Sequence, residues 1–247
     1  MVGAVGAALR PGELLNSTGT TEGLLYLRDA PRLDEQAQHD KLANGLACSG
    51  SEYTLFASIP TGGSAYATLQ LLLGLGADRL DACLADLHER YLRAAIDLHA
   101  VPLVLPHFRG SPPPTKNPAA RGAISGLGAD TGLEDLVLGC FLGMAWQFCE
   151  VLELFGVPTE RVKVIGPGSR NGLWLQLKAD LLGVPLEAAR FPEVVSRGAQ
   201  ALASGVPTAW ESTQPVDIET DAVRHARLTG WREDHRTPWA RLQDLSV

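Results

Sequence analysis

The chain has 247 residues, of which 45% are hydrophobic and 20% are charged, a composition typical of a globular protein with a sizeable core. Lys and Arg total 21 against 28 Asp and Glu, giving a formal net charge of −7 that argues against a general nucleic-acid-binding protein. No apolar run reaches the roughly 18 residues of a membrane span, and Met1 opens no basic-then-apolar leader. We therefore expect a cytoplasmic protein without membrane contact.

Strand-like and helix-like patterns alternate along the chain. Short apolar or β-branched runs bounded by turn residues indicate strands, and apolar residues at three- and four-residue spacing indicate helices. The expected elements, in chain order, are strands at 24–27 and 53–59, helices at 64–75 and 78–100, strands at 101–105 and 123–127, a helix at 133–155, a strand at 162–165, a helix at 171–182, a strand at 186–189, and helices at 196–203 and 221–236. This order predicts an α/β domain with a partly parallel sheet.

Three further features complete the local predictions. Residues 29–51 form a polar stretch, which we expect to be a loop or an irregular excursion. Residues 108–121 contain four prolines, which exclude regular structure because proline lacks the backbone donor and fixes φ. Thr131, followed three residues later by Glu134, predicts a capping box at the start of the longest helix.

The cysteines and histidines show no metal-site spacing. Since no CxxC pair occurs, we interpret the cysteines as free buried thiols of a reducing compartment. These cysteines are Cys48, Cys83, Cys140 and Cys149. The histidines form no HExxH or HxxxH pair, so a structural zinc site is not expected. His107 beside the proline-rich loop either contacts a substrate or sits half-buried at the surface, and Arg109, Lys116 and Arg121 make that loop locally basic.

Three glycine-containing turns have the chemistry of phosphate or nucleotide binding. The Gly-Pro-Gly turn at 166–168 stands between a strand and a helix, where a backbone can open toward an anion. Residues 16–22 place four hydroxyls around Gly19, and the Gly-Gly-Ser sequence at 62–64 begins a helix whose amides would be free. Each pattern also fits an ordinary turn or helix start. Together they favour a ligand that bears phosphate.

The ordered set of motifs resembles the C-terminal half of the FGGY carbohydrate kinases, over nearly the whole chain from about residue 2 to 245. The stretches that carry the resemblance are Arg-Pro-Gly-Glu at 10–13 through Gly-Thr-Thr at 19–21, Pro-Ala-Ala-Arg-Gly-Ala at 118–123 through 126–127, 166–180, and 198–203. The resemblance implies a ribonuclease-H-like α/β fold of the actin-like ATPase class. Residues 1–247 would form the C-terminal domain, with about 214–247 as a terminal helical extension that packs its tryptophans on the main body.

The same resemblance implies a binding site for ATP, with Mg²⁺ carried by the nucleotide. The residues implied as contacts are Gly19 and Thr20 on a hairpin facing the γ-phosphate, Gly63 at a helix start near the phosphates, and Gly166, Pro167, Gly168 and Asn171 along the adenosine. The chain departs from the family pattern at Pro167, where a second glycine is usual, and at Ala67 and Ser111, where a polar residue and an acid are usual.

The resemblance also implies a first lobe and a catalytic aspartate immediately upstream of Met1. We therefore expect the chain to be the nucleotide-binding lobe of an ATP-dependent sugar or polyol kinase that is inactive alone. The first lobe would lie on a separate chain, or the exposed lobe face would self-associate. The alternative is a non-catalytic nucleotide-binding or interaction remnant of such a kinase. Weak binding of ATP or ADP to the chain alone is expected.

Overall fold

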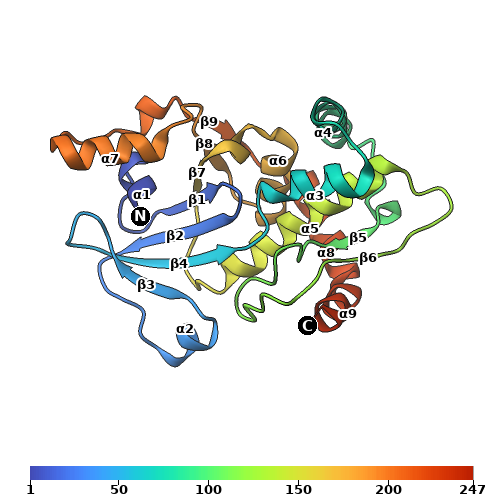
Figure 1. The fold of residues 1–247 in the computed structure, drawn as a ribbon, viewed down its shortest axis with the longest axis horizontal. Coiled ribbons are helices and arrows are strands. Elements are labelled where there is room, and N and C mark those ends of the chain that lie inside the picture. Colours follow the sequence, from blue (N-terminus) through green and yellow to red (C-terminus); the bar gives the residue numbers. More distant parts are fainter. Residues whose placement is uncertain (247) are drawn as a thin grey trace.

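A seven-stranded mixed sheet forms the centre of the protein, which the computed structural model describes for residues 1–246 (Figure 1). Its strands are β1 (Leu14–Thr18), β2 (Glu22–Arg28), β3 (Ala43–Leu46), β4 (Tyr53–Ile59), β7 (Val162–Ile165), β8 (Leu186–Ala188) and β9 (Val216–Ile218). They lie in the order β3-β4-β2-β1-β7-β8-β9, with β1, β7 and β8 mutually parallel and the other pairs antiparallel. The prediction of an α/β domain with a partly parallel sheet is confirmed.

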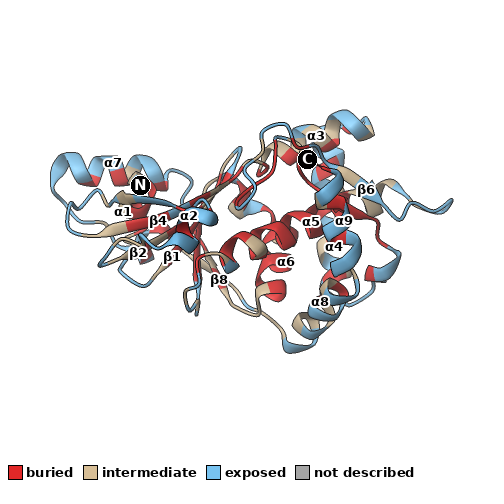
Figure 2. Cartoon of the chain, turned by 90° about the horizontal axis from the view of Figure 1, so that it is seen from below, coloured by how far each residue is buried: buried red, intermediate tan, exposed pale blue. Residues whose placement is uncertain are grey.

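Helices cover both faces of this sheet, and a separate two-stranded sheet stands beside it. The remaining elements are α1 (Val2–Gly6), α2 (Glu35–His39), α3 (Ser64–Leu73), α4 (Ala77–Leu92), η1 (Leu98–Ala100), β5 (Leu103–Leu105), β6 (Ala123–Ser125), α5 (Leu133–Glu153), η2 (Pro167–Arg170), α6 (Gly172–Leu182), α7 (Val194–Ser204), η3 (Trp210–Thr213), α8 (Ala222–Asp234) and α9 (Arg236–Leu245). Figure 2 shows α1 and α7 on one side of the sheet and α5 and α6, largely buried, on the other.

The strands divide their side chains between two cores, as the period-2 geometry of a strand requires. Leu14 and Leu24 face the larger core, which the strands share with α5 and α6. Leu15 and Leu25, each one residue further along, face the smaller core beneath α1 and α7. The sheet is therefore covered on both faces, as expected where parallel strands form its centre.

Helix α5 is the spine of the larger core. Among the described residues it is the one helix long and apolar enough to cross a membrane. Its most apolar stretch is 83% buried inside the protein. Gly143 allows its close approach to β5, since a Cβ there would lie 2.0 Å from the carbonyl oxygen of Val104. The expected Thr131–Glu134 capping box is wrong. Instead the Asp135 carboxylate accepts from the amide of Gly132, at 2.8 Å.

The C-terminal helices dock on α5 through aromatic rings. Trp231 of α8 and Trp239 of α9 lie with their ring centroids 5.3 and 4.5 Å from that of Trp146. Glu150 accepts from the Trp239 indole at 2.8 Å, and burial raises the pKa of this carboxyl to about 7. The expected packing of terminal aromatics on the main body is thus observed.

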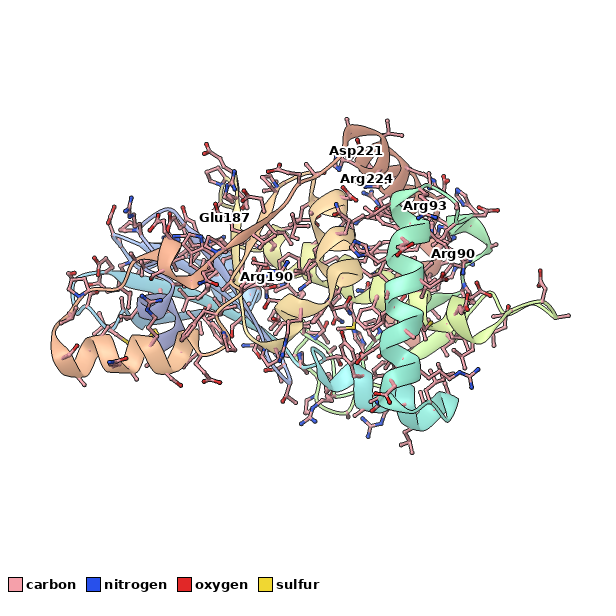
Figure 3. All side chains as sticks on the ribbon, turned by 90° about the horizontal axis from the view of Figure 1, so that it is seen from above. Arg90, Arg93, Glu187, Arg190, Asp221 and Arg224 are labelled. Atoms are coloured by element: carbon pink, nitrogen blue, oxygen red, sulfur yellow. The ribbon has the colours of Figure 1, made fainter. Side chains whose placement is uncertain are left out.

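Asp180 of α6 is the polar anchor of α8. Its buried carboxylate accepts from the Tyr91 hydroxyl at 3.0 Å and from Arg224 Nε at 2.7 Å. Figure 3 shows Arg224 and Asp221 together at the start of α8, where Asp221 caps the helix by accepting from two backbone amides.

Several sequence expectations need correction. The stretch at 29–51 is not wholly irregular, since it contains α2 and β3. The helix expected at 78–100 ends at Leu92, because Ala94 adopts a positive φ of 54°. The helix expected at 221–236 is split by His235 into α8 and α9, and the segment 214–247 also contributes strand β9. Cys48 is exposed rather than buried, and His107 is buried rather than half-buried at the surface.

Candidate functional site

A cavity of about 1020 Å³ opens where the parallel strands β1 and β7 end. Every residue that the resemblance implied as a nucleotide contact lines it, except Gly166. Those lining residues are Gly19, Thr20, Gly63, Pro167, Gly168 and Asn171. Ligands of open α/β sheets bind at the carboxyl ends of the strands, so the cavity lies where this architecture favours a site.

One wall of the cavity is the hairpin between β1 and β2 together with the start of α3. The Thr20 carbonyl accepts from the amides of Gly62 and Ser64, both at 3.1 Å, and the Gly19 carbonyl accepts from the Gly63 amide at 2.8 Å. The first amides of α3 are therefore occupied. The expectation that free amides at this helix start would meet a phosphate is wrong, because the hairpin carbonyls already satisfy them.

The glycines of this wall allow the backbone of the hairpin and the backbone at the start of α3 to approach each other closely. A Cβ on Gly63 would lie 2.8 Å from the Gly19 carbonyl oxygen, and a Cβ on Gly62 would lie 2.6 Å from the Thr21 carbonyl carbon. Of the four hydroxyls expected around Gly19, the Thr20 side chain is exposed and lines the cavity, whereas Thr18 is buried and donates to the Ile165 carbonyl at 2.9 Å.

The facing wall is the turn from β7 through η2 into α6. Gly166 has a φ of 96°, which favours glycine, and a Cβ there would lie 2.7 Å from the Thr18 carbonyl oxygen. Pro167 occupies the first position of η2, where its fixed φ suits the helix and its missing amide hydrogen costs no internal bond. The replacement of a glycine by Pro167 is therefore compatible with this turn. Gly168 packs closely, since a Cβ would lie 2.7 Å from the Trp174 ring.

Asn171 joins the two walls. Its side-chain oxygen caps α6 by accepting from the Trp174 amide at 3.0 Å, and its Nδ2 donates to the Tyr66 hydroxyl at 2.5 Å. Burial raises the pKa of Tyr66 to about 12, so the phenol stays neutral at physiological pH. The Tyr66 ring packs edge-on against Phe141, with centroids 5.5 Å apart. Asn171 thus caps a helix and orients an aromatic side chain of the cavity.

A third wall was missed by sequence reasoning. Asp81, Leu84, Ala85 and His88 follow the i, i+3, i+4, i+7 spacing of one helix face, and together they line the cavity from α4. The apolar spacing in this segment predicts a helix, but it does not indicate which of its residues face a cavity. Burial lowers the pKa of His88, and the nearby Arg224 lowers it further, so the imidazole is neutral at physiological pH.

A buried ion pair stands behind both walls. Lys178 of α6 donates to the Asn16 side chain at 3.0 Å and to the carboxylate of Glu22, the residue that resumes the sheet after the hairpin. Its ammonium also lies 4.0 Å from the ring centroid of Trp174. Lys178 and Glu22 are both fully buried, and burial lowers the pKa of Lys178 and raises that of Glu22. This pair connects α6 to the base of the hairpin.

In the described residues, 1–246, no group of three or more His, Cys, Asp or Glu side chains is placed to hold a metal ion. The cavity lining combines apolar surface of α4 with polar and charged side chains. The polar and charged groups are those of Thr20, Ser64, Tyr66, Asp81, His88, Arg109, Arg170 and Asn171. This combination suits a ligand with an apolar planar part and an anionic part.

Comparison with known proteins identifies relatives of this chain. The model of the FGGY family of carbohydrate kinases, C-terminal domain, matches residues 14–205. A glycerol kinase of Bordetella pertussis is 27% identical over 251 residues, covering 92% of this chain and 47% of that protein. Glycerol kinase 1 of Clostridium tetani is 31% identical over 197 residues, covering 74% of this chain and 38% of that protein.

A solved structure shares the fold. Plasmodium falciparum glycerol kinase with ADP matches with a TM-score of 0.75 at 17% identity, covering 100% of this chain and 49% of that chain. The chain thus spans about half the length of these relatives. The expected actin-like ATPase fold and the expected family resemblance are confirmed.

Proposed function

Since the chain belongs to the FGGY family of carbohydrate kinases, we propose that its cavity binds ATP or ADP. The chain would serve as the nucleotide-binding lobe of a cytoplasmic kinase that transfers a phosphoryl group from ATP to a hydroxyl of a sugar or polyol. The observation that carries the proposal is that Gly19, Thr20, Asn171 and their neighbours, implied by the family pattern, line one cavity. Its volume of about 1020 Å³ is at the upper end of ordinary ligand pockets, which suits a nucleotide.

The geometry supports one orientation of the nucleotide. The adenine would lie against the α4 wall, where Leu84 and Ala85 offer apolar surface and the neutral His88 adds no charge. The phosphates would extend toward the hairpin, where Thr20 presents an exposed hydroxyl. Mg²⁺, arriving with the nucleotide, would neutralise the phosphate charge that develops during transfer.

The acceptor and the partner lobe belong to the same proposal. Phosphoryl transfer requires an oriented acceptor hydroxyl, a group that accepts its proton, and phosphate contacts from both sides. We propose that a first lobe supplies these groups. That lobe would belong to a longer form of this protein or lie on a separate chain, or self-association of this chain would take its place. The related proteins are glycerol kinases, which makes polyols the first acceptors to test.

Calorimetric titration of the 247-residue chain with ATP, ADP and adenosine tests the nucleotide site. We expect all three to bind competitively, and Ala85→Phe to abolish binding because the ring would fill the adenine end of the cavity. Ala82→Phe, three residues earlier on the same helix but outside the lining, is the matched control and should bind normally.

If no nucleotide binds at millimolar concentration, the assignment of the cavity is wrong and the interaction-remnant alternative replaces it. If nucleotide binds, ATP consumption is then measured with glycerol and other polyols, with and without a co-expressed first lobe. We expect acceptor-dependent turnover only when that lobe is present. Robust turnover by the 247-residue chain alone would overturn the requirement for a partner lobe.

A further inference from the structure

Two arginines in the cavity are not explained by the adenosine contacts. Arg109 follows β5 in the proline-rich loop, and Arg170 ends η2, yet both line the same cavity as Thr20. Both side chains are exposed, and within residues 1–246 neither guanidinium makes an ion pair or a hydrogen bond. Several other arginines of the chain are paired, including Arg161 with Glu187 and Arg224 with Asp180.

The start of α3 offers an anion in this cavity few backbone donors. The amides that begin α3 donate to the carbonyls of Gly19 and Thr20, so this helix start does not present them to a phosphate. The lining nevertheless carries a net positive charge. The two positive charges of Arg109 and Arg170 exceed the single negative charge of Asp81, and His88 is neutral. This local excess contrasts with the net charge of −7 of the whole chain.

Arg109 is presented by an anchored loop. Gly110 beside it has a φ of 95°, and a Cβ there would lie 2.8 Å from the Asn117 carbonyl oxygen. Ser111 and Asn117 exchange two hydrogen bonds of 2.9 Å, one through the buried Ser111 hydroxyl. The preceding His107 is held by the Ser246 hydroxyl at 2.7 Å. The loop is therefore fixed on both sides of Arg109.

Arg170 is presented by an equally fixed turn. Gly168, two residues earlier, packs against the Trp174 ring and Thr18. Asn171, the next residue, is locked as the cap of α6. An arginine whose backbone is already ordered loses less entropy when it binds, and its planar fork matches two phosphate oxygens.

We propose that Arg109 and Arg170 bind the phosphate chain of the nucleotide directly, in place of the occupied amides at the start of α3. The inference rests on the proposed function and assigns to these side chains the recognition of phosphate rather than of adenosine. It makes the site selective for nucleoside polyphosphates over nucleosides. Arginine forks hold phosphate oxygens through charge-assisted hydrogen bonds, whose strength grows with the charge of the ligand.

The test measures dissociation constants of ATP, ADP, AMP and adenosine for the 247-residue chain and its variants. We expect Arg109→Ala and Arg170→Ala each to weaken ATP about tenfold or more while adenosine changes less than about twofold. The double variant should lose the preference for ATP over adenosine. Arg109→Lys and Arg170→Lys should fall between wild type and alanine, because lysine keeps the charge but not the fork.

The control is Arg241→Ala on α9, an exposed arginine outside the cavity lining, which should leave all four affinities unchanged. Circular dichroism and thermal unfolding verify that each variant is folded. If the alanine variants keep the wild-type ratio of ATP to adenosine affinity, the phosphate role is wrong while the nucleotide site stands. If wild type binds neither ATP nor adenosine, the proposed function itself fails and this inference falls with it.

Discussion

The two main walls of the cavity are held in place by different kinds of interaction. The hairpin wall is closed by backbone bonds, in which the carbonyls of Gly19 and Thr20 accept from the first amides of α3. The η2–α6 wall is held by side chains, through the packing of Trp174 around Gly168 and the capping amide of Asn171. Substitutions in the first wall can therefore test ligand binding alone, whereas those in the second also change the wall.

The largest expected effect comes from Lys178, which connects the two walls. Lys178→Met would leave the Glu22 carboxylate buried without its cation, and breaking a buried pair in this way costs about 3–5 kcal/mol. We expect the free energy of unfolding, measured by urea denaturation, to fall by that amount. Such a loss is a large fraction of the stability of an ordinary domain.

The double variant Lys178→Met, Glu22→Gln is the control for the ion pair. A neutral amide at position 22 removes the uncompensated charge and still accepts a hydrogen bond from Asn16, so part of the stability should return. Equal loss in the single and double variants would mean that packing around Lys178, between the Phe148 and Trp174 rings, is what matters.

The next effect is expected at Gly168 in the side-chain wall. Gly168→Ala would place a Cβ 2.7 Å from the Trp174 ring and 2.8 Å from the Thr18 Cβ, neither of which can move freely. Overpacking of this kind costs about 1–3 kcal/mol. Because η2 must shift, ATP and adenosine should both bind more weakly, as measured by calorimetry.

Gly230→Ala in α8 is the matched control, since open space surrounds that position. Replacing a glycine inside a helix by alanine should raise the free energy of unfolding by up to about 1 kcal/mol and leave nucleotide affinity unchanged. If Gly168→Ala were equally harmless, the close packing assigned to η2 would be wrong.

The same contrast between the walls appears in what could be predicted from sequence. The β-branched strand at 162–165, its glycine turn and the helix that follows are local signals, and the structure has them at those positions. Strand β1 was missed, because its hydroxyl residues favour turns and its partner β7 lies more than half the chain away in sequence. The occupancy of the α3 amides was missed for a similar reason, since it depends on the docking of a distant hairpin.

The α4 wall shows a further limit of sequence reasoning. Apolar spacing correctly indicated the helix and its buried face through Leu80, Leu84 and Leu87. The spacing carried no information about which flank of that helix would face a cavity, so Asp81 and His88 were not singled out. That choice is made by the packing of α3, α5 and α6 around the helix, which is a tertiary effect.

A smaller effect is expected at Asn171. Asn171→Ala removes the cap of α6 and the bond to Tyr66, and the loss of a cap costs about 0.5–2 kcal/mol of folding stability. ATP and adenosine should weaken to the same extent, because the disturbance lies at the adenosine end of the cavity. Thermal unfolding and calorimetry measure the two effects separately.

Asp221→Ala removes the corresponding cap of α8, which accepts from the amides of Val223 and Arg224, away from the cavity. We expect a similar loss of stability and no change in nucleotide affinity. A drop in affinity in both cap variants would show that binding follows global stability, and Asn171 would then have no specific role in the site.

The smallest effect on stability is expected at Thr20, because backbone hydrogen bonds rather than its side chain hold the hairpin against α3. Thr20→Ala leaves the carbonyls of residues 19 and 20 hydrogen-bonded to the amides that begin α3. Because the Thr20 hydroxyl is exposed and makes no internal contact that folding requires, the free energy of unfolding should change by less than about 0.5 kcal/mol. If the hydroxyl binds phosphate, the lost bond to a charged group is worth about 1.5–3 kcal/mol, or roughly tenfold to a hundredfold in ATP affinity.

Adenosine binding should be unaffected by Thr20→Ala, because the hydroxyl would touch only phosphate. Thr21→Ala, the next residue of the hairpin, also removes an exposed hydroxyl, but one outside the cavity lining, and it should change neither affinity. If Thr20→Ala weakened ATP and adenosine alike, or destabilised the fold as Asn171→Ala does, the hairpin wall would also depend on its side chains. The distinction between a wall closed by backbone and a wall closed by side chains would then be lost.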